Sequence, residues 1–284
     1  MTGPVHEAEG DDPNRHRRAL GRVFNEDPEL YDRVRPSYPD ALFADLVAIG
    51  GIDGRSSVLE VGCGTGQATG SLARLGCAVT ALEPGAAMAA LARRRVAGFA
   101  HVGIETASFE AWEDGGRRFD VVVAASSWHW VDPTVGWPKA RRVLVPGGWM
   151  ALAGHVVVRR PGEAEVYAET AYLHQRYAPG GPDWGHPPLE DEVRASAHGW
   201  GLVADPGALF EPPVARWYPT VQWLDGEGFA DLLRSMSIYR RLDPQVREPL
   251  LDAIAERIRT RMGDRVPRRS LTVLRMGRRA EASG

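Results

Sequence analysis

A short apolar segment followed by three closely spaced glycines constrains the fold of this 284-residue chain more than any other feature. Ser57–Val61 is rich in β-branched residues, glycines follow at positions 62, 64 and 66, and a helix-like pattern runs from Ala68 to Leu75. This order predicts a buried strand, a tight turn and a helix. Glycine suits the turn because the backbone there takes φ and ψ values that a Cβ forbids and because a ligand can approach the main chain. In an open α/β sheet, ligands bind outside the carboxyl ends of the strands, so the turn is a candidate binding site.

The spacing of these glycines separates two classes of ligand. The dinucleotide fingerprint G-x-G-x-x-G needs a glycine where this chain has Gln67, which disfavours a pyrophosphate ligand. The chain has G-x-G-x-G instead, with the acid Glu60 two residues before Gly62, and this resembles motif I of the class I S-adenosylmethionine (SAM) dependent methyltransferases. In that family the glycine loop packs against the methionine part of SAM. The resemblance implies SAM contacts at Glu60, Gly62, Cys63, Gly64, Gly66 and Gln67, whereas an ordinary tight turn is the alternative for this stretch alone.

An acid also follows the second predicted strand, Ala78–Leu82. Glu83 lies at the position where a carboxylate can accept hydrogen bonds from both ribose hydroxyls of an adenosine, since it offers two acceptor oxygens. We therefore predict cofactor contacts at Glu83 and Pro84. Met88, one helical turn further, either lies against the adenine ring or belongs to the core.

The third predicted strand, His101–Thr106, leads to the residues that border the adenine ring in the family. Ser108 and Phe109 occupy those positions here. Many relatives place an acid next to the adenine amino group, and this chain has a serine there, or Glu110 if the register shifts by a residue or two.

The fourth predicted strand, Phe119–Ala125, is a continuous apolar run, as a central parallel strand should be. Ser126 follows it and is a candidate cofactor contact, and His129 is a candidate general base because histidine titrates near neutral pH. The alternative for His129 is a packing role between two tryptophans.

The acceptor side is predicted from aromatic residues. Aromatic rings suit a planar or apolar acceptor, and packing in the core is the competing explanation for them. The candidate acceptor-binding residues are Tyr38, Trp128, His129, Trp130 and Trp217.

The segment Tyr31–Pro39, with the pattern Tyr-Asp-x-x-Arg-Pro-x-Tyr-Pro, is similar to the leader of small-molecule methyltransferases, which folds over the cofactor as a lid. This implies cofactor contacts at Tyr31 and Arg35. Alternatively, the tyrosines only anchor the leader to the domain. If the acceptor is a carboxylate, no base is needed, and Arg35 or another arginine would bind it.

A Pro-Gly-Gly turn at residues 146–148 extends the resemblance to about Ala153. The chain looks most like the small-molecule branch, of the kind classed as methyltransferase types 11 and 25, which includes trans-aconitate and biosynthetic methyltransferases. The resemblance implies an α/β fold: a Rossmann-like, seven-stranded mixed sheet with its last strand antiparallel, helices on both faces and a mainly helical cap. The expected divisions are a disordered tail (1–20), an N-terminal helical lid (21–50), a SAM-binding core (51–155), a cap insertion over the acceptor site (156–209) and the completion of the core (210–284).

The composition of the chain limits the classes of molecule that it is expected to bind. The formal net charge of −3 gives no electrostatic case for nucleic acid. Two cysteines are too few for a disulfide framework or zinc cluster, and no apolar run is long enough to span a membrane, so we expect a cytoplasmic protein without metal, monomeric or homodimeric. The expected reaction is methyl transfer from SAM to a small-molecule acceptor, which yields S-adenosylhomocysteine. RNA or protein methylation and a non-catalytic SAM-binding regulator are the alternatives.

Overall fold

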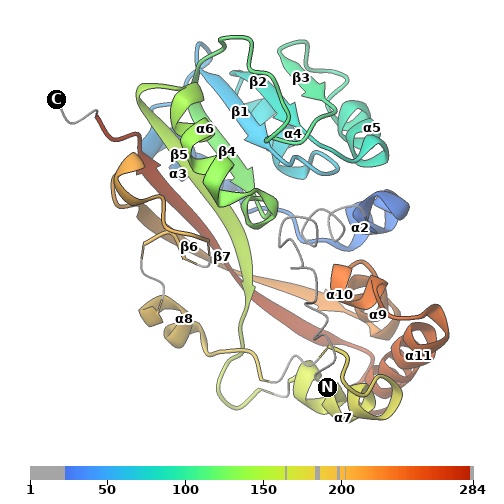
Figure 1. Cartoon of the computed structure of the whole chain (residues 1–284). Coiled ribbons are helices and arrows are strands. Elements are labelled where there is room, and N and C mark those ends of the chain that lie inside the picture. The colour runs from blue at the N-terminus through green and yellow to red at the C-terminus, as the bar shows by residue number, and fades with distance from the viewer. Residues whose placement is uncertain (1–22, 164, 183–185, 197–198, 202, 282–284) are drawn as a thin grey trace, which may run out of the picture.

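A seven-stranded mixed sheet organises the molecule (Figure 1). The computed structural model describes residues 23–163, 165–182, 186–196, 199–201 and 203–281, so the predicted tail over 1–20 lies outside the described residues. The strands are β1 (Ser57–Val61), β2 (Ala78–Leu82), β3 (Val102–Glu105), β4 (Phe119–Ala125), β5 (Leu144–Val157), β6 (Val214–Leu224) and β7 (Val266–Arg278). Their order is β3-β2-β1-β4-β5-β7-β6, with β1 to β5 parallel and β7 antiparallel to both neighbours. The predicted fold class is confirmed.

Helices cover both faces of the sheet. On one face α3 (Asp40–Gly50), α4 (Gln67–Arg74) and α5 (Ala86–Arg95) share an apolar cluster with alternate strand residues such as Val121. On the other face α6 (Pro133–Val143) packs on the intervening residues, such as Val122. Each face of β4 is therefore buried, which explains why its sequence is apolar without alternation.

The Pro-Gly-Gly segment at residues 146–148 lies inside β5. Phe119 pairs with Leu144, but Val121 pairs with Trp149, so the segment forms a bulge. Gly147 has φ +74°, and its carbonyl accepts a hydrogen bond of 3.0 Å from Arg278 Nε.

A second helical group packs on the far ends of the long strands. One apolar cluster joins α2 (Pro28–Val34), α7 (Val166–Tyr177), α9 (Gly226–Arg234), α10 (Ser237–Arg240) and α11 (Pro244–Arg261). Figure 1 shows α7 and α9 to α11 on the far side of α2 from β1 to β3. Thus α7 of the predicted cap packs with α9 to α11 from the segment predicted to complete the core, and the domain boundaries stay predictions.

The remaining elements are short. They comprise the 3-10 helices η1 (Val23–Glu26), η2 (Trp128–Trp130) and η3 (Gly207–Leu209), and α8 (Glu190–Ser196), whose Val193 packs against Leu271 of β7. Within the described residues, no helix combines the length and apolarity needed to cross a membrane, and no group of three or more histidine, cysteine, aspartate or glutamate side chains could hold a metal ion.

Candidate active site

The glycine loop after β1 has a backbone that only glycine adopts without strain. Gly62, Gly64 and Gly66 have φ values of +71°, +58° and +83°. A Cβ on Gly62 would lie 2.6 Å from Ser127 Cβ, and one on Gly66 would lie 3.0 Å from Ala92 Cα. Gly62 and Gly66 therefore let the loop pack against the segment after β4 and against α5. At Gly64 the nearest atom would be Met88 Cε at 3.6 Å, which leaves main chain that a ligand can approach.

Glu83 holds this loop from the end of β2. Its Oε2 accepts a hydrogen bond from the Gly64 N–H at 2.9 Å, and its Oε1 accepts one from the Gly85 N–H at 2.8 Å. Burial raises the pKa of Glu83, although the two backbone hydrogen bonds oppose the shift. Each carboxylate oxygen has a second lone pair. Glu83 can therefore accept hydrogen bonds from the two ribose hydroxyls of SAM while it still accepts those from the loop.

Glu60 is a buried acid at the end of β1. Its side chain is 1% exposed, and Oε2 accepts a hydrogen bond of 2.6 Å from the Thr69 hydroxyl of α4. Burial raises the pKa of Glu60 to about 7, with a smaller contribution from the charge of Glu83. Among the residues that the structure describes, no cation pairs with Glu60. A carboxylate in this setting fits the ammonium group of a methionine moiety.

Replacing Glu60 with glutamine should change the pH dependence of stability of the ligand-free protein. The folded-state pKa near 7 lies above the unfolded value near 4.5, so the folded state favours the protonated acid. That stabilisation is complete below about pH 4.5 and is lost as pH rises through 7. We expect the glutamine variant to exceed the wild type by about 3 kcal/mol in free energy of unfolding at pH 8 and to match it at pH 4.5. Urea denaturation at both pH values measures this, and equal losses of stability with pH in the two proteins would contradict it.

The leader segment is fastened to the glycine loop. Asp32 of α2 accepts a hydrogen bond of 2.6 Å from the Thr65 hydroxyl and pairs with Arg95 at 2.5 Å. Gln67 Nε2 also donates to the Asp32 carbonyl at 3.2 Å. Half-buried Tyr31 lies under the Arg35 guanidinium, 4.9 Å from ring centroid to Cζ, and desolvation of its phenol raises the pKa of Tyr31. Thus the leader covers the carboxyl edge of the sheet, whereas movement as a lid stays a prediction.

Ser126, next to the residue that contacts the glycine loop, forms a hydrogen bond with Tyr38, which in turn stacks on His155. It is a non-glycine residue with φ +56° at the carboxyl end of β4, where strained backbone often marks a functional position. Its Oγ accepts a hydrogen bond of 2.7 Å from the Tyr38 hydroxyl. The Tyr38 ring stacks on His155 of β5, with 4.7 Å between centroids. Sequence reasoning missed His155; its only signal is a polar residue in an otherwise apolar strand.

The candidate adenine contacts are largely packed in the core. Met88 is 4% exposed and Phe109 is 3% exposed, with Phe109 next to the ring of Trp128. The Ser108 hydroxyl accepts a hydrogen bond of 3.3 Å from the Ala111 N–H, and Glu110 accepts one of 3.0 Å from the Asp132 N–H. The Glu110 carboxylate therefore forms a hydrogen bond with the residue that precedes α6. Among the other candidates, Cys63 is buried and Pro84 is exposed.

The tryptophans fall into different environments. Trp128 is 5% exposed and meets Trp137 edge to face at 4.9 Å, inside the core beside α6. Trp130 is half-buried and lies 4.6 Å from the exposed ring of His129. Trp217 of β6 lies beside Arg275, 5.2 Å from centroid to Cζ. Because its neighbour Tyr218 bonds to Asp45 of α3, Trp217 faces the opposite side of the sheet from Tyr38.

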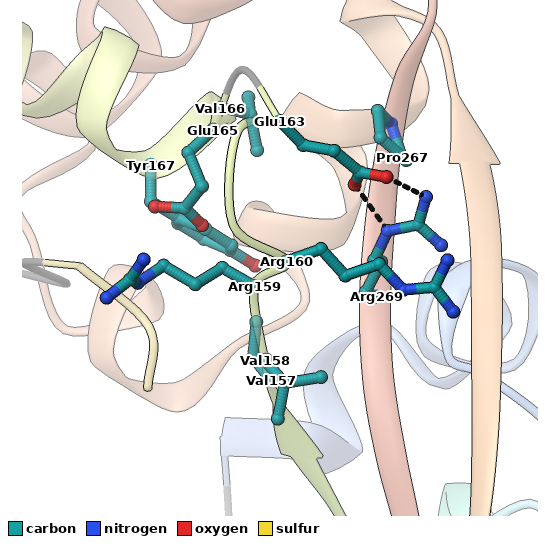
Figure 2. Close-up of a pocket in the computed structure, with 10 residues that line it drawn as sticks. All are labelled: Val157, Val158, Arg159, Arg160, Glu163, Glu165, Val166, Tyr167, Pro267 and Arg269. Atoms are coloured by element: carbon teal, nitrogen blue, oxygen red, sulfur yellow. Dashed lines mark hydrogen bonds and ion pairs between the residues drawn. The ribbon is translucent and has the colours of Figure 1, made fainter. Parts of the chain in front are cut away.

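Among the described residues, the structure has one hollow away from this arrangement and one that borders it. One, of about 10 Å³, has room for roughly one water molecule and lies between β5, α7 and β7 (Figure 2). There Glu163 pairs with Arg269 through contacts of 2.5 and 2.6 Å, which braces the loop after β5. The other, of about 390 Å³, lies between the leader and α4, and its lining includes Asp32, Arg35, Tyr38, Gln67 and Arg95.

Comparison with known proteins agrees with this geometry. Residues 58–148 match the family model described as a methyltransferase domain. A solved structure from Anaeromyxobacter dehalogenans, provisionally assigned to the type II methyltransferases, is 28% identical with a TM-score of 0.59 and covers 86% of this chain and 97% of its own. Residues 58–148 thus match a methyltransferase domain, and these findings together with the fold support a class I SAM-dependent methyltransferase with SAM as its cofactor.

Two mycobacterial relatives extend the comparison. An uncharacterized methyltransferase of Mycobacterium tuberculosis is 27% identical over 244 residues, which cover 86% of this chain and 88% of the relative. A trans-aconitate 2-methyltransferase of the same species is 30% identical over 162 residues, which cover 50% of this chain and 56% of the relative. A SAM-dependent methyltransferase from Thiobacillus denitrificans, solved with S-adenosylhomocysteine, shares the fold at 18% identity and a TM-score of 0.50, covering 91% of this chain and 98% of its own.

Proposed function

We propose that the protein methylates a small molecule enclosed between the end of β4, the leader and the extended part of β5. The observation that supports this proposal is the fastening of α2 on both sides. Asp32 pairs with Arg95 of α5, and Arg33 pairs with Asp231 of α9 at 2.9 Å. An acceptor beneath this helix has to be small enough to be enclosed. RNA or protein methylation is less compatible with such a covered edge, and one relative is named for methylation of trans-aconitate, a small molecule.

The chemistry asks mainly for positioning. When bound, SAM supplies a methyl group on a positively charged sulfur, which the acceptor's nucleophile takes as the carbon–sulfur bond breaks and S-adenosylhomocysteine is left. Glu60, Glu83 and the loop glycines would hold the donor, and Tyr38 with Ser126 would fix the acceptor side. Holding donor and acceptor in this orientation can lower the activation barrier by about 7–11 kcal/mol. Enclosure by the leader would also remove water from the nucleophile.

Fewer aromatic rings are available to contact the acceptor than the sequence suggests. The hypothesis of a planar or apolar acceptor depends on tryptophans, and Trp128 and Trp137 are buried among core residues. Half-buried Trp130 stays a candidate wall beside His129.

His129 is the candidate general base for an acceptor that loses a proton. Although His129 is exposed, the protein around its ring removes part of the solvent and lowers the pKa of the imidazole below the usual 6.5, so the ring is neutral and able to accept a proton at pH 7. We expect His129→Asn to lower turnover about a hundredfold and to remove the decline in rate as pH falls through that pKa. His101→Asn, remote from the site and bonded to the Ala73 carbonyl, is the control and should keep the wild-type pH profile. An unchanged rate in His129→Asn would leave that residue a packing role.

The function itself can be tested without knowing the acceptor. The protein is incubated with SAM labelled on the methyl group and, separately, with a deproteinised metabolite extract, total RNA and a protein extract. Label that enters the metabolite fraction alone supports the proposal. Label in RNA or protein only, or binding of SAM without transfer to any fraction, contradicts it.

The proposal extends to location and partners. We infer a cytoplasmic monomer or homodimer that acts without nucleic acid or membrane. The buried, unbridged thiols of Cys63 and Cys77 are compatible with a reducing compartment.

A further inference from the structure

A buried polar patch lies on one face of the sheet, between the apolar cluster under α3 to α5 and the apolar cluster of α2, α7 and α9 to α11. In the antiparallel register, His155 of β5 is opposite Thr272 of β7, and Arg268 of β7 is opposite Gln222 of β6. Positions 268, 270 and 272 alternate along β7, so their side chains point to the same face. Tyr38 covers this face by stacking on His155. The face therefore lies next to Ser126 and the glycine loop.

This face holds positive charge without a compensating acid. Arg268 is 5% exposed; one terminal nitrogen donates to the Ser270 hydroxyl at 3.2 Å, and its Nε has no hydrogen-bond partner within the described ranges. No carboxylate of those ranges forms an ion pair with Arg268. Arg35 lies near enough that its pKa is lowered by burial and by the charge of Arg268. Like charges brought close together in a partly buried place repel each other, and a ligand of opposite charge relieves that repulsion.

His155 adds a neutral donor to the same place. Its Nδ1 lies 2.9 Å from the Thr272 hydroxyl, and its Nε2 is buried without a partner among the described residues. Burial and the charges of Arg268 and Arg35 lower its pKa to about 4, so the ring is neutral at pH 7. The threonine hydroxyl can donate to Nδ1, which leaves the proton on Nε2.

We propose that Arg268 and His155, with Arg35 beside them, bind a carboxylate group of the acceptor. The inference rests on the proposed small-molecule function and names its substrate class. A guanidinium presents a planar pair of donors that matches the two oxygens of a carboxylate, and the His155 N–H can bond to one of them. Because Tyr38 connects this subsite to Ser126, a carboxylate anchored here directs the rest of the acceptor toward the glycine loop.

Binding can be measured independently of turnover. The protein saturated with S-adenosylhomocysteine is titrated by calorimetry with citrate, malonate, benzoate and phenylacetate, and with the corresponding amides. At least one carboxylate should bind, and its amide should bind at least about tenfold more weakly. NMR titration of His155 should show its pKa rising when that carboxylate binds. Binding of the amides as tightly as the acids, or of inorganic phosphate with none of the acids, would overturn the inference.

Two arginines on one strand give matched variants. Arg268→Gln should weaken carboxylate binding at least about tenfold, and it should fold because it relieves repulsion with Arg35. Arg275 is also buried on β7 and also has an unpartnered Nε within the described part of the chain, but it lies at an odd-numbered position on the other face. Arg275→Gln should therefore keep the affinity. Arg268→Lys retains the charge without the planar fork and should fall between them. Equal affinities in Arg268→Gln and Arg275→Gln would overturn the inference.

Methyl transfer separates this inference from the proposed function. A metabolite extract is divided by anion exchange, and each fraction is tested with labelled SAM. Labelled product from the retained, anionic fraction supports the subsite. Label confined to the unretained fraction contradicts the subsite and leaves the proposed function standing, whereas no label in either fraction contradicts the proposed function itself.

Discussion

Replacing Glu83 with alanine is expected to weaken SAM binding about a thousandfold. The change removes two predicted charge-assisted hydrogen bonds to the ribose, each worth about 1.5–3 kcal/mol. Their sum of about 4 kcal/mol corresponds to three orders of magnitude in Kd. It also leaves the Gly64 and Gly85 N–H groups, which now donate hydrogen bonds to Glu83, without that acceptor. Calorimetric titration with SAM measures the loss.

Glu105 provides the matched control for this experiment. It ends β3, the strand that pairs with β2, but its carboxylate is engaged with Arg117 at 2.5 Å and with Trp112 Nε1 at 2.7 Å. Glu105→Ala should leave the affinity for SAM within about twofold of the wild type, because a partly exposed pair contributes little. If Glu83→Ala binds SAM as well as this control does, the ribose assignment is wrong.

Gly62→Ala is expected to lower the free energy of unfolding by about 2–5 kcal/mol. A left-handed backbone costs a residue with a Cβ about 1–2 kcal/mol. The new Cβ would also lie 2.6 Å from Ser127 Cβ, and such overpacking adds about 1–3 kcal/mol. Urea denaturation measures the loss, and SAM affinity should fall as well because Ser127 follows Ser126 at the end of β4.

Gly51→Ala separates the two causes. Gly51 has a similar φ of +65°, but no atom lies within 4 Å of the position of its Cβ. We expect this variant to lose only the backbone contribution of about 1–2 kcal/mol and to keep its affinity for SAM. Equal losses of stability in the two variants would mean that the contact with Ser127 is relieved without cost.

The donor half of the fold could be predicted because its signals are local. Each parallel strand from β1 to β4 is a short apolar segment, and the glycine loop and Glu83 follow directly from the residues beside them. Glu83 lies beside the loop because parallel strands end at the same edge of a sheet. The close contact of Gly62 with Ser127 also depends on this alignment, through the pairing of β1 with β4.

The acceptor half depends on contacts between distant segments, so the sequence alone does not define it. His155 and Arg268 are single polar residues in long strands, and their meeting depends on a pairing of β5 with β7 across more than 100 residues. Hydrophobic patterns likewise indicate that Trp128 and Trp217 favour burial without indicating which face receives them. The association of α2 with α9, marked by Arg33 and Asp231, joins segments 198 residues apart.

The unequal strand lengths have a consequence for how ligands enter. β1 and β2 have five residues each, whereas β5 and β7 have 14 and 13 and continue without interruption from the methyltransferase core into the helical group. We expect a helical group built on strands that continue from the core to move together with the sheet and not about a hinge. We therefore expect substrate and product to exchange through release of the seven-residue helix α2, which is held by polar contacts, while the rest of the molecule stays assembled.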